Sequence, residues 1–476
     1  MRPSRFRTAG LAVLAGTLLL GTPAVGMAAT ADYPSDEAKP DIVRVDEGYE
    51  RFWVSDGKND LHGTVKDPKT LARDDSLIVW INNHATPEQQ RRAMQDSEYQ
   101  NKTNTSYDQS ITIGEALGSK LGPLYVQGRQ DGSLPLTTAL INSSDGTTGA
   151  YVDTGDAKKR YSHPRPFLPA DPKAAPKPGD EPACAPEKVN ASSLASERAG
   201  KPYADASGTL NIKRVPDFTD SSKKYSPNDV DLSAQYGKKS LCTGGSYPSG
   251  HTTTAYQAGI TLATLVPELA PELLTRASEA GNNRIVLGVH YPLDIMGGRM
   301  NGEAALAARW SDAKFREEKL EPARKELVGY LEKKCGGKLA ACIAQGKGYS
   351  DNPYGGKALP GGSPQIVTDR ASAVKVYKER MTYGFEQVEN GGQKPSVPAG
   401  AENLLLTTFP TLNDAQRTSV LAQTEIDSGY PLDQTGTAGG SWQRLNLAAA
   451  TSAVVKVQPD GSVKVVKTGG KACVIK

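Results

Sequence analysis

Residues 248–294 read PSGHTTTAYQAGITLATLVPELAPELLTRASEAGNNRIVLGVHYPLD and carry clear helix signals. Ser249 suits a helix N-cap, and small and apolar side chains follow it at three- and four-residue steps. A second helix is predicted to begin at about Pro271 and to stop near Gly288. A third begins at Pro292 and continues through GGRMNGEAALAARW. The sequence therefore predicts three successive helices in this region.

Helix signals also occur on both sides of this stretch. Thr86-Pro87 is typical of a helix start. The end of the chain, VVKVQPDGSVKVV, alternates around Pro-Asp-Gly and predicts a β-hairpin. The fold is therefore predicted to be mainly α, with a small C-terminal β-hairpin. Other expected helices cover about residues 86–98, 111–121, 321–334, 368–382 and 412–424.

Length and charge limit the classes of protein to consider. The chain has 476 residues, enough for one large domain or two ordinary ones, and 37% of them are hydrophobic. A formal net charge of +3 argues against a dedicated nucleic-acid binder, which needs a strong basic surplus. Residues 170–240 are rich in Pro, Ala, Lys and Asp with little periodicity, so we expect a long surface excursion there.

The N-terminus has the features of an export signal. Basic residues precede an uncharged apolar stretch, and small residues then offer cleavage sites, so residues 1–31 are predicted to be a signal peptide. No later segment has roughly 18 consecutive apolar residues, so no other membrane span is expected. We therefore expect a secreted or extracytoplasmic protein, in the cell envelope or periplasm, without integral membrane association after cleavage.

Five cysteines fit an oxidising compartment. Cys335 and Cys342 flank a short Gly-containing loop and are a natural local pair. Cys184 and Cys242 could close the long segment between them, which leaves Cys473 over, but pairing cannot be proved from sequence. None of the spacings is typical of a zinc site, so no metal is expected.

Three segments carry side chains suited to an anion. They are KKRYSHPRP at 158–166, PSGH at 248–251 and RIVLGVHYPLD at 284–294. Each has an ordinary explanation when it is taken alone. A basic run is usually a solvated face, a Ser before a helix is an N-cap, and Asp294 is an acid in a first helical turn.

Together the segments describe a site for a tetrahedral oxyanion. Lys158, Arg165 and Arg284 supply three cations, two of which have guanidinium forks that match phosphate oxygens. Ser249 and Gly250 open a helix, where free backbone N–H groups and the helix dipole favour an anion.

Two of the five histidines, His251 and His290, occupy positions in these segments that suit chemistry on a phosphate. His290 and Asp294 are four residues apart at a helix start, so Asp294 can accept a hydrogen bond from one imidazole nitrogen. The other nitrogen is then free to attack phosphorus. His251 is a second imidazole, available to protonate a leaving oxygen.

The three segments resemble the pattern KxxxxxxRP, PSGH and SRxxxxxHxxxD of the type 2 phosphatidic acid phosphatase (PAP2) superfamily. This superfamily includes bacterial class A acid phosphatases, vanadium haloperoxidases and membrane lipid phosphatases. The resemblance implies a helical bundle of the acid phosphatase/vanadium haloperoxidase type. It implies that His290 is the nucleophile, His251 the general acid and Asp294 the partner of His290. The phosphate-binding residues that it implies are Lys158, Arg165, Ser249, Gly250 and Arg284.

The chain departs from the superfamily pattern in two places. Asn283 stands where the pattern has Ser, which could alter one polar contact to an oxygen. The stretch between Pro166 and Pro248 is longer than is usual in the superfamily, and the insertion at about 170–240 accounts for the extra length. We expect a catalytic domain at 32–345 that includes this insertion, and a C-terminal extension at 346–476 packed on the core.

The resemblance favours a metal-independent acid phosphatase that hydrolyses phosphate monoesters through a phosphohistidine and needs no cofactor. Its partners would be small phosphorylated substrates, with no nucleic acid. The alternative is a vanadium-dependent haloperoxidase that uses the same oxyanion pocket for vanadate, and sequence separates the two poorly. A non-catalytic phosphate-binding protein is a third possibility, but every matched catalytic position is filled.

Overall fold

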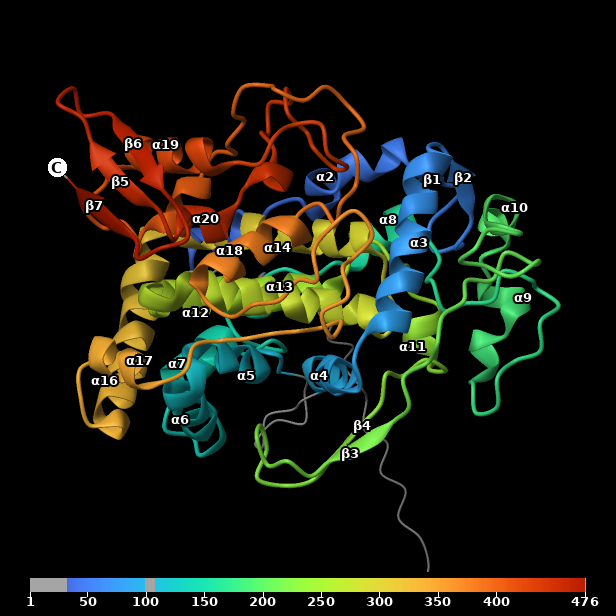
Figure 1. The fold of residues 1–476 in the computed structure, drawn as a ribbon, viewed down its shortest axis with the longest axis horizontal. Helices are drawn as coiled ribbons and strands as arrows, with labels where there is room; N and C mark the ends of the chain where they lie inside the picture. Colours follow the sequence, from blue (N-terminus) through green and yellow to red (C-terminus); the bar gives the residue numbers. More distant parts are fainter. Residues whose placement is uncertain (1–31, 99–107, 476) are drawn as a thin grey trace, which may run out of the picture.

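A computed structural model describes residues 32–98 and 108–475, so the expected signal peptide at 1–31 lies outside the described residues. The described chain is mainly α-helical, as predicted, and contains three small sheets (Figure 1). The longer helices are α3 (Pro68–His84), α4 (Pro87–Glu98), α6 (Gly118–Gln130), α12 (Gly250–Leu265), α13 (Ala270–Val286), α14 (Pro292–Ser311), α16 (Glu321–Cys335), α18 (Arg370–Arg380) and α19 (Asp414–Thr424). The shorter helices are α1 (Pro34–Glu37), α2 (Ile42–Val45), α5 (Ser110–Ile113), α7 (Pro135–Ile141), α8 (Gly155–Tyr161), α9 (Pro186–Val189), α10 (Ala195–Arg198), α11 (Lys239–Cys242), α15 (Ala313–Phe315), α17 (Leu339–Gln345) and α20 (Leu447–Ala450).

Most helices lie close to the predicted ranges. The apolar stretch predicted as one helix at 111–121 is divided, because Gly118 has a φ of +86° between a short 3₁₀ turn and α6. A positive φ of this kind is readily adopted only by glycine, so the chain changes direction there.

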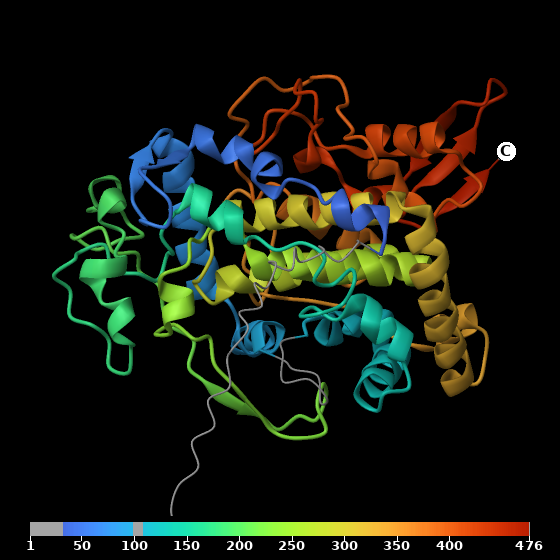
Figure 2. The same cartoon turned by 180° about the vertical axis from the view of Figure 1, so that it is seen from behind.

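Helices α12, α13 and α14 lie side by side at the centre of the molecule (Figures 1 and 2). Ser249 caps α12, since its Oγ accepts a hydrogen bond from the backbone N–H of Thr252 at 3.2 Å. A Cβ atom at Gly298 of α14 would lie 2.7 Å from the carbonyl oxygen of Ser249, so glycine is needed for this close approach. The starts of α12 and α14 are thereby held together, and the backbone N–H of Ser249 donates to the carbonyl of Asp294 at 3.0 Å.

Helix α4 covers one face of α13 through a buried layer of polar side chains. The Arg276 guanidinium donates to Asp96 Oδ2 at 2.9 Å, and Arg92 Nε donates to Glu279 Oε1 at 2.7 Å. Such paired charges suit burial far better than single ones, because each ion satisfies its partner. This layer fixes α4 along α13 and therefore places the last turn of α4 beside the C-terminal end of α13.

The insertion at about 170–240, which was predicted to be a surface excursion, also makes buried contacts with the rest of the molecule. It contains short helices and an antiparallel pair of strands, β3 (Phe218–Asp220) and β4 (Val230–Leu232). Arg198 is 1% exposed and donates to Asp75 of α3 and to the hydroxyl of Tyr291. A segment without apolar periodicity is thus anchored in part by a buried ion pair, which sequence patterns do not reveal.

Both cysteine pairs considered from the sequence are bonded. Cys184 and Cys242 form a disulfide that closes the insertion, and Cys335 and Cys342 form a local one after α16. Cys473 is free and exposed. In the part of the chain that the structure describes, none of the helices combines the length and apolarity that a bilayer crossing requires.

The last third of the chain packs over α13 and α14 (Figure 1). The predicted hairpin is confirmed as β5 (Val454–Val457) and β6 (Val463–Lys467), and β7 (Cys473–Ile475) adds a parallel strand on the other side of β5. A fourth pair, β1 (Trp53–Ser55) and β2 (Gly63–Val65), lies near the N-terminus of the described chain.

Candidate active site

His290 lies in the connection between α13 and α14. Gly288 has a φ of +71°, so helix α13 ends before it, and Pro292 begins α14 two residues after the histidine. His290 is 1% exposed, and its Nδ1 lies 2.9 Å from Oδ2 of Asp294. The same carboxylate oxygen accepts the backbone N–H of Tyr291 at 2.9 Å. The four-residue spacing read from the sequence therefore produces a direct contact.

The second nitrogen of His290 faces a cation. Nη1 of Arg165 lies 2.9 Å from His290 Nε2. A guanidinium can only donate, so Nε2 accepts, and the ring proton of the neutral imidazole is assigned to Nδ1, facing Asp294. Burial first, and then the nearby cations led by Arg165, lower the pKa of His290 well below its usual value.

Two of the expected cations are anchored to backbone carbonyls. Lys158 of α8 donates from Nζ to the carbonyls of Gly245 at 2.8 Å and Ser246 at 3.0 Å. Arg165 donates to the carbonyls of Gly244 at 3.1 Å and Val289 at 2.9 Å. Their ammonium and guanidinium groups are thus held in place by uncharged partners.

These cations lower one another's pKa. Burial followed by the charge of Arg284 lowers the pKa of Arg165 to about 9. Burial and Arg165 lower the pKa of Lys158 well below its usual value. The site therefore carries an excess of positive charge around His290, with the ionised form of Asp294 as a nearby negative charge. An arrangement of this kind favours an anion.

The PSGH segment brings a helix N-terminus to the same place. Ser249 is fully buried, and its Oγ contacts both the N–H and the hydroxyl of Thr252. A Cβ atom at Gly250 would lie 3.0 Å from Oγ1 of Thr154. The charges of Arg284, Arg165 and Lys158 act on the ring of His251, the second residue of the 16-residue helix α12, so the start of this helix lies near the cations. The helix dipole also favours negative charge there.

Ser97, in the last turn of α4, contacts two of the expected site residues. Its hydroxyl accepts a hydrogen bond from Nη1 of Arg284, and its main chain bonds to the ring of His251. Burial and the cations, Arg284 first, lower the pKa of His251 well below its usual value. Sequence reasoning missed Ser97, because nothing in its neighbourhood suggests a contact 187 residues away.

Asn283, the departure from the superfamily pattern, faces α4. Its side-chain oxygen accepts from Gln89 Nε2 at 2.8 Å, and its nitrogen donates to Asp96 Oδ2 at 2.7 Å. Both polar atoms are therefore used in the packing of α4 on α13. Ser246 and His163 were also missed, although both lie next to predicted site residues in the sequence.

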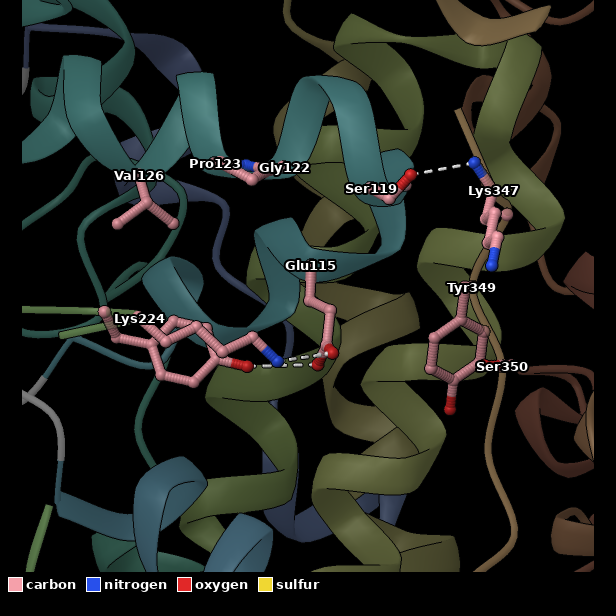
Figure 3. Close-up of a pocket in the computed structure, with 12 residues that line it drawn as sticks. Glu115, Ser119, Gly122, Pro123, Val126, Lys224, Lys347, Tyr349 and Ser350 are labelled. Carbon is pink, nitrogen blue, oxygen red and sulfur yellow. Dashed lines mark hydrogen bonds and ion pairs between the residues drawn. The ribbon is translucent and has the colours of Figure 1, made fainter. Parts of the chain in front are cut away.

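A separate cavity of about 390 Å³ lies between α6 and residues 347–350 (Figure 3). Glu115 forms part of its wall and accepts hydrogen bonds from Lys224 at 2.7 Å and Tyr225 at 3.0 Å (Figure 3). None of the site residues predicted from the sequence lines this cavity. Within the described ranges, no group of three or more His, Cys, Asp or Glu side chains is arranged to hold a metal ion.

The family model of the PAP2 superfamily matches residues 136–317, a range that includes all three segments from which the site was predicted. This chain contains a PAP2 superfamily domain. The match also agrees with the mainly helical fold around α12, α13 and α14.

Several curated relatives of this chain are named acid phosphatases. An acid phosphatase of Zymomonas mobilis is 34% identical over 117 residues, which cover 25% of this chain and 44% of the relative. A non-specific acid phosphatase of Providencia stuartii is 33% identical over 88 residues, covering 18% and 35%. One of Salmonella typhimurium is 34% identical over 90 residues, covering 19% and 36%. The chain thus spans less than half the length of these relatives.

Proposed function

We propose that this protein is an acid phosphatase that hydrolyses phosphate monoesters. The observation that carries the proposal is the setting of His290. One ring nitrogen contacts Asp294 and the other faces Arg165, and the charges of Lys158 and Arg284 act on the same ring. The acid phosphatases among the relatives support the same activity.

In the proposed reaction, Nε2 of His290 attacks phosphorus while the bond from phosphorus to the ester oxygen breaks. His251 gives its proton to that oxygen, and the alcohol leaves. Water then attacks the phosphohistidine and passes a proton to His251, the phosphorus–nitrogen bond breaks, and phosphate is released. The net change is one ester and one water converted to one alcohol and one phosphate.

The cations and the start of α12 supply the electrostatic part of this mechanism. Lys158, Arg165 and Arg284 would hold the equatorial phosphate oxygens as charge spreads over them in the transition state. The N–H groups that follow Ser249 and Gly250 would add hydrogen bonds from the helix N-terminus. Asp294 would keep the proton of His290 on Nδ1 and leave Nε2 with a free electron pair.

We further propose that the protein acts outside the cytoplasm. Its two disulfides fit an oxidising compartment, as does the signal peptide expected at residues 1–31. We also propose that residues 32–345 form the catalytic domain and that residues 346–476 are an extension packed against it.

The direct test is an assay of the purified protein with nitrophenyl phosphate beside the His290→Ala variant. We expect hydrolysis by the wild type and only background release by the variant. A parallel assay with bromide or chloride, peroxide and vanadate tests the haloperoxidase alternative. Halide oxidation without ester hydrolysis would overturn the proposal.

A further inference from the structure

Ser246 contacts three residues at the candidate site, Lys158, His163 and Asp294. Its carbonyl accepts from Lys158 Nζ at 3.0 Å, and its backbone N–H donates to the carbonyl of His163 at 2.8 Å. Its hydroxyl oxygen lies 3.3 Å from Nδ1 of His163 and 3.5 Å from Oδ1 of Asp294. Ser246 is fully buried, so these contacts are shielded from water.

His163 is enclosed by aromatic rings. The ring centroids of Tyr49, Trp53 and Tyr291 lie 5.9, 4.7 and 5.1 Å from that of His163, all in edge-on arrangements. Its Nε2 is buried and has no hydrogen-bond partner among the residues that the structure describes. Burial and the charge of Arg198 lower the pKa of His163 well below its usual value, so the ring is neutral.

These contacts fix the direction of the hydrogen bonds. A neutral imidazole has one N–H, and a buried N–H without an acceptor is rarer than a buried acceptor without a donor. The proton therefore lies on Nδ1 of His163, which donates to the Ser246 hydroxyl. The carbonyl of Pro164 also favours a proton on this ring. The single hydroxyl proton of Ser246 is then directed to Oδ1 of Asp294.

We propose that Ser246 and His163 are positioning residues for Asp294: they orient its carboxylate and favour its ionised form, so that Oδ2 holds the proton of His290 on Nδ1. This inference rests on the proposed function, in which Nε2 of His290 must carry a free electron pair. Neither Ser246 nor His163 touches the reacting atoms. Their effect reaches the reaction only through the carboxylate of Asp294.

Asp294 needs such support because burial raises its pKa to about 7. The hydrogen bonds from Tyr291 and Ser246 act against this shift by stabilising the carboxylate. The negative charges of Asp46 and Asp74 oppose the ionisation of Asp294. The positive charges of Lys158 and Arg165 favour it. The titratable groups that face Asp294 are Lys158, Arg165, His290, Tyr291, Tyr49, Asp46 and Asp74.

Steady-state kinetics of three variants test the proposal. Ser246→Ala is the most direct of them, because it removes the hydroxyl and leaves the backbone contacts of residue 246 in place. We expect kcat to fall about tenfold with KM little changed, which is the loss expected for one hydrogen bond to a charged group. The acidic limb of the pH profile should move to higher pH, since Asp294 becomes harder to ionise. His163→Leu should behave alike, whereas His163→Asn keeps a donor near Nδ1 and should recover most of kcat.

Ser143→Ala is the matched control. Ser143 is 6% exposed, and its hydroxyl has no partner within the described part of the chain. This variant should keep the wild-type kcat and pH profile. An unchanged acidic limb in both Ser246→Ala and His163→Leu would show that the two residues do not act on Asp294.

A spectroscopic measurement separates this inference from the proposed activity. With only five histidines in the chain, ¹⁵N-histidine labelling can report the protonation of each ring by NMR. We expect His163 to be neutral with its proton on Nδ1. A proton on Nε2 of His163 overturns the inference whether or not the protein hydrolyses phosphate esters. Failure of the wild type to hydrolyse any ester refutes the proposed function instead, and the NMR result still tests how His163 and Ser246 are hydrogen-bonded.

Discussion

Nη1 of Arg165 lies 2.9 Å from Nε2 of His290, and the same nitrogen also donates to the carbonyl of Val289. The guanidinium is therefore fixed to the residue next to the proposed nucleophile. In the proposed reaction, this N–H of Arg165 must turn from Nε2 to a phosphate oxygen, so that the electron pair of Nε2 is free to attack phosphorus. The hydrogen bond to Val289, the residue before His290, keeps the guanidinium beside the ring while this N–H changes its partner.

Replacement of Arg165 by Lys should test this geometry. An ammonium group keeps the charge, but it cannot contact His290, Val289 and a phosphate oxygen in one plane. We expect kcat/KM to fall on the order of 10²-fold, as for loss of one transition-state donor. Steady-state kinetics with nitrophenyl phosphate provide the measurement. Arg91→Lys on the exposed side of α4 is the control, and equal activity in both variants would contradict the assignment.

The pH dependence should reflect His251 on the alkaline side. Its pKa is lowered, so the protonated form exists only at acidic pH, and the general acid is lost as the pH rises. A bound phosphate anion offsets the cations and raises this pKa again. On the acidic side, activity should fall as the carboxylate of Asp294 gains a proton. Hydrolysis of an alkyl phosphate should therefore follow a bell-shaped profile with its maximum at acidic pH.

The variant His251→Ala should separate good from poor leaving groups. Nitrophenolate departs without a proton, whereas an alkoxide does not, so we expect a loss of about 10²–10⁴-fold for sugar phosphates and much less for release of nitrophenol. The alkaline limb should also disappear for the sugar phosphate. His62→Ala serves as the control. Equal losses for both substrates would argue against a general-acid role.

The central helices and the direct contact of His290 with Asp294 could be predicted from the sequence, because both depend on spacing within a few residues. Ser249 could be predicted as an N-cap for the same reason. The contact of Ser97 with Arg284 could not be predicted, since it depends on how the polar layer between α4 and α13 sets the register of two helices.

The buried contacts of Arg198 in the insertion could not be predicted for a related reason. Arg198 lies in a segment with no apolar periodicity, and only the tertiary structure brings it to Asp75 and Tyr291. Strand β7 was also missed, because its parallel pairing with β5 involves no tight turn that the sequence could reveal.

Activity should not depend on a divalent metal. The proposed mechanism stabilises charge with side-chain cations and backbone N–H groups, so turnover should survive EDTA. Orthovanadate should inhibit competitively, because it adopts the five-coordinate geometry of the phosphoryl transition state. It should also raise the Tm of the wild type more than that of Arg284→Ala. Loss of activity with EDTA that zinc or magnesium restores would refute the mechanism.

The C-terminal extension should matter for stability and not for chemistry. Tyr377 of α18 donates its hydroxyl to Oε1 of the buried Glu303 at 3.1 Å, and Arg299 is the ionic partner of this carboxylate. Tyr377→Phe removes one hydrogen bond to a buried charged pair, so we expect the free energy of unfolding to fall by about 1–3 kcal/mol. Denaturant unfolding measures this change, and kcat should stay within about twofold because Tyr377 makes no contact with the site residues.

Tyr383→Phe is the matched comparison for this prediction. Tyr383 is fully buried in the same extension, yet its hydroxyl has no hydrogen-bond partner in the described chain. Removal of an unpaired buried hydroxyl should leave the free energy of unfolding unchanged or raise it slightly. If Tyr377→Phe were as stable as Tyr383→Phe, the extension would not stabilise the core through Glu303. If Tyr377→Phe instead lost activity at full stability, the extension would have to act on the catalytic site.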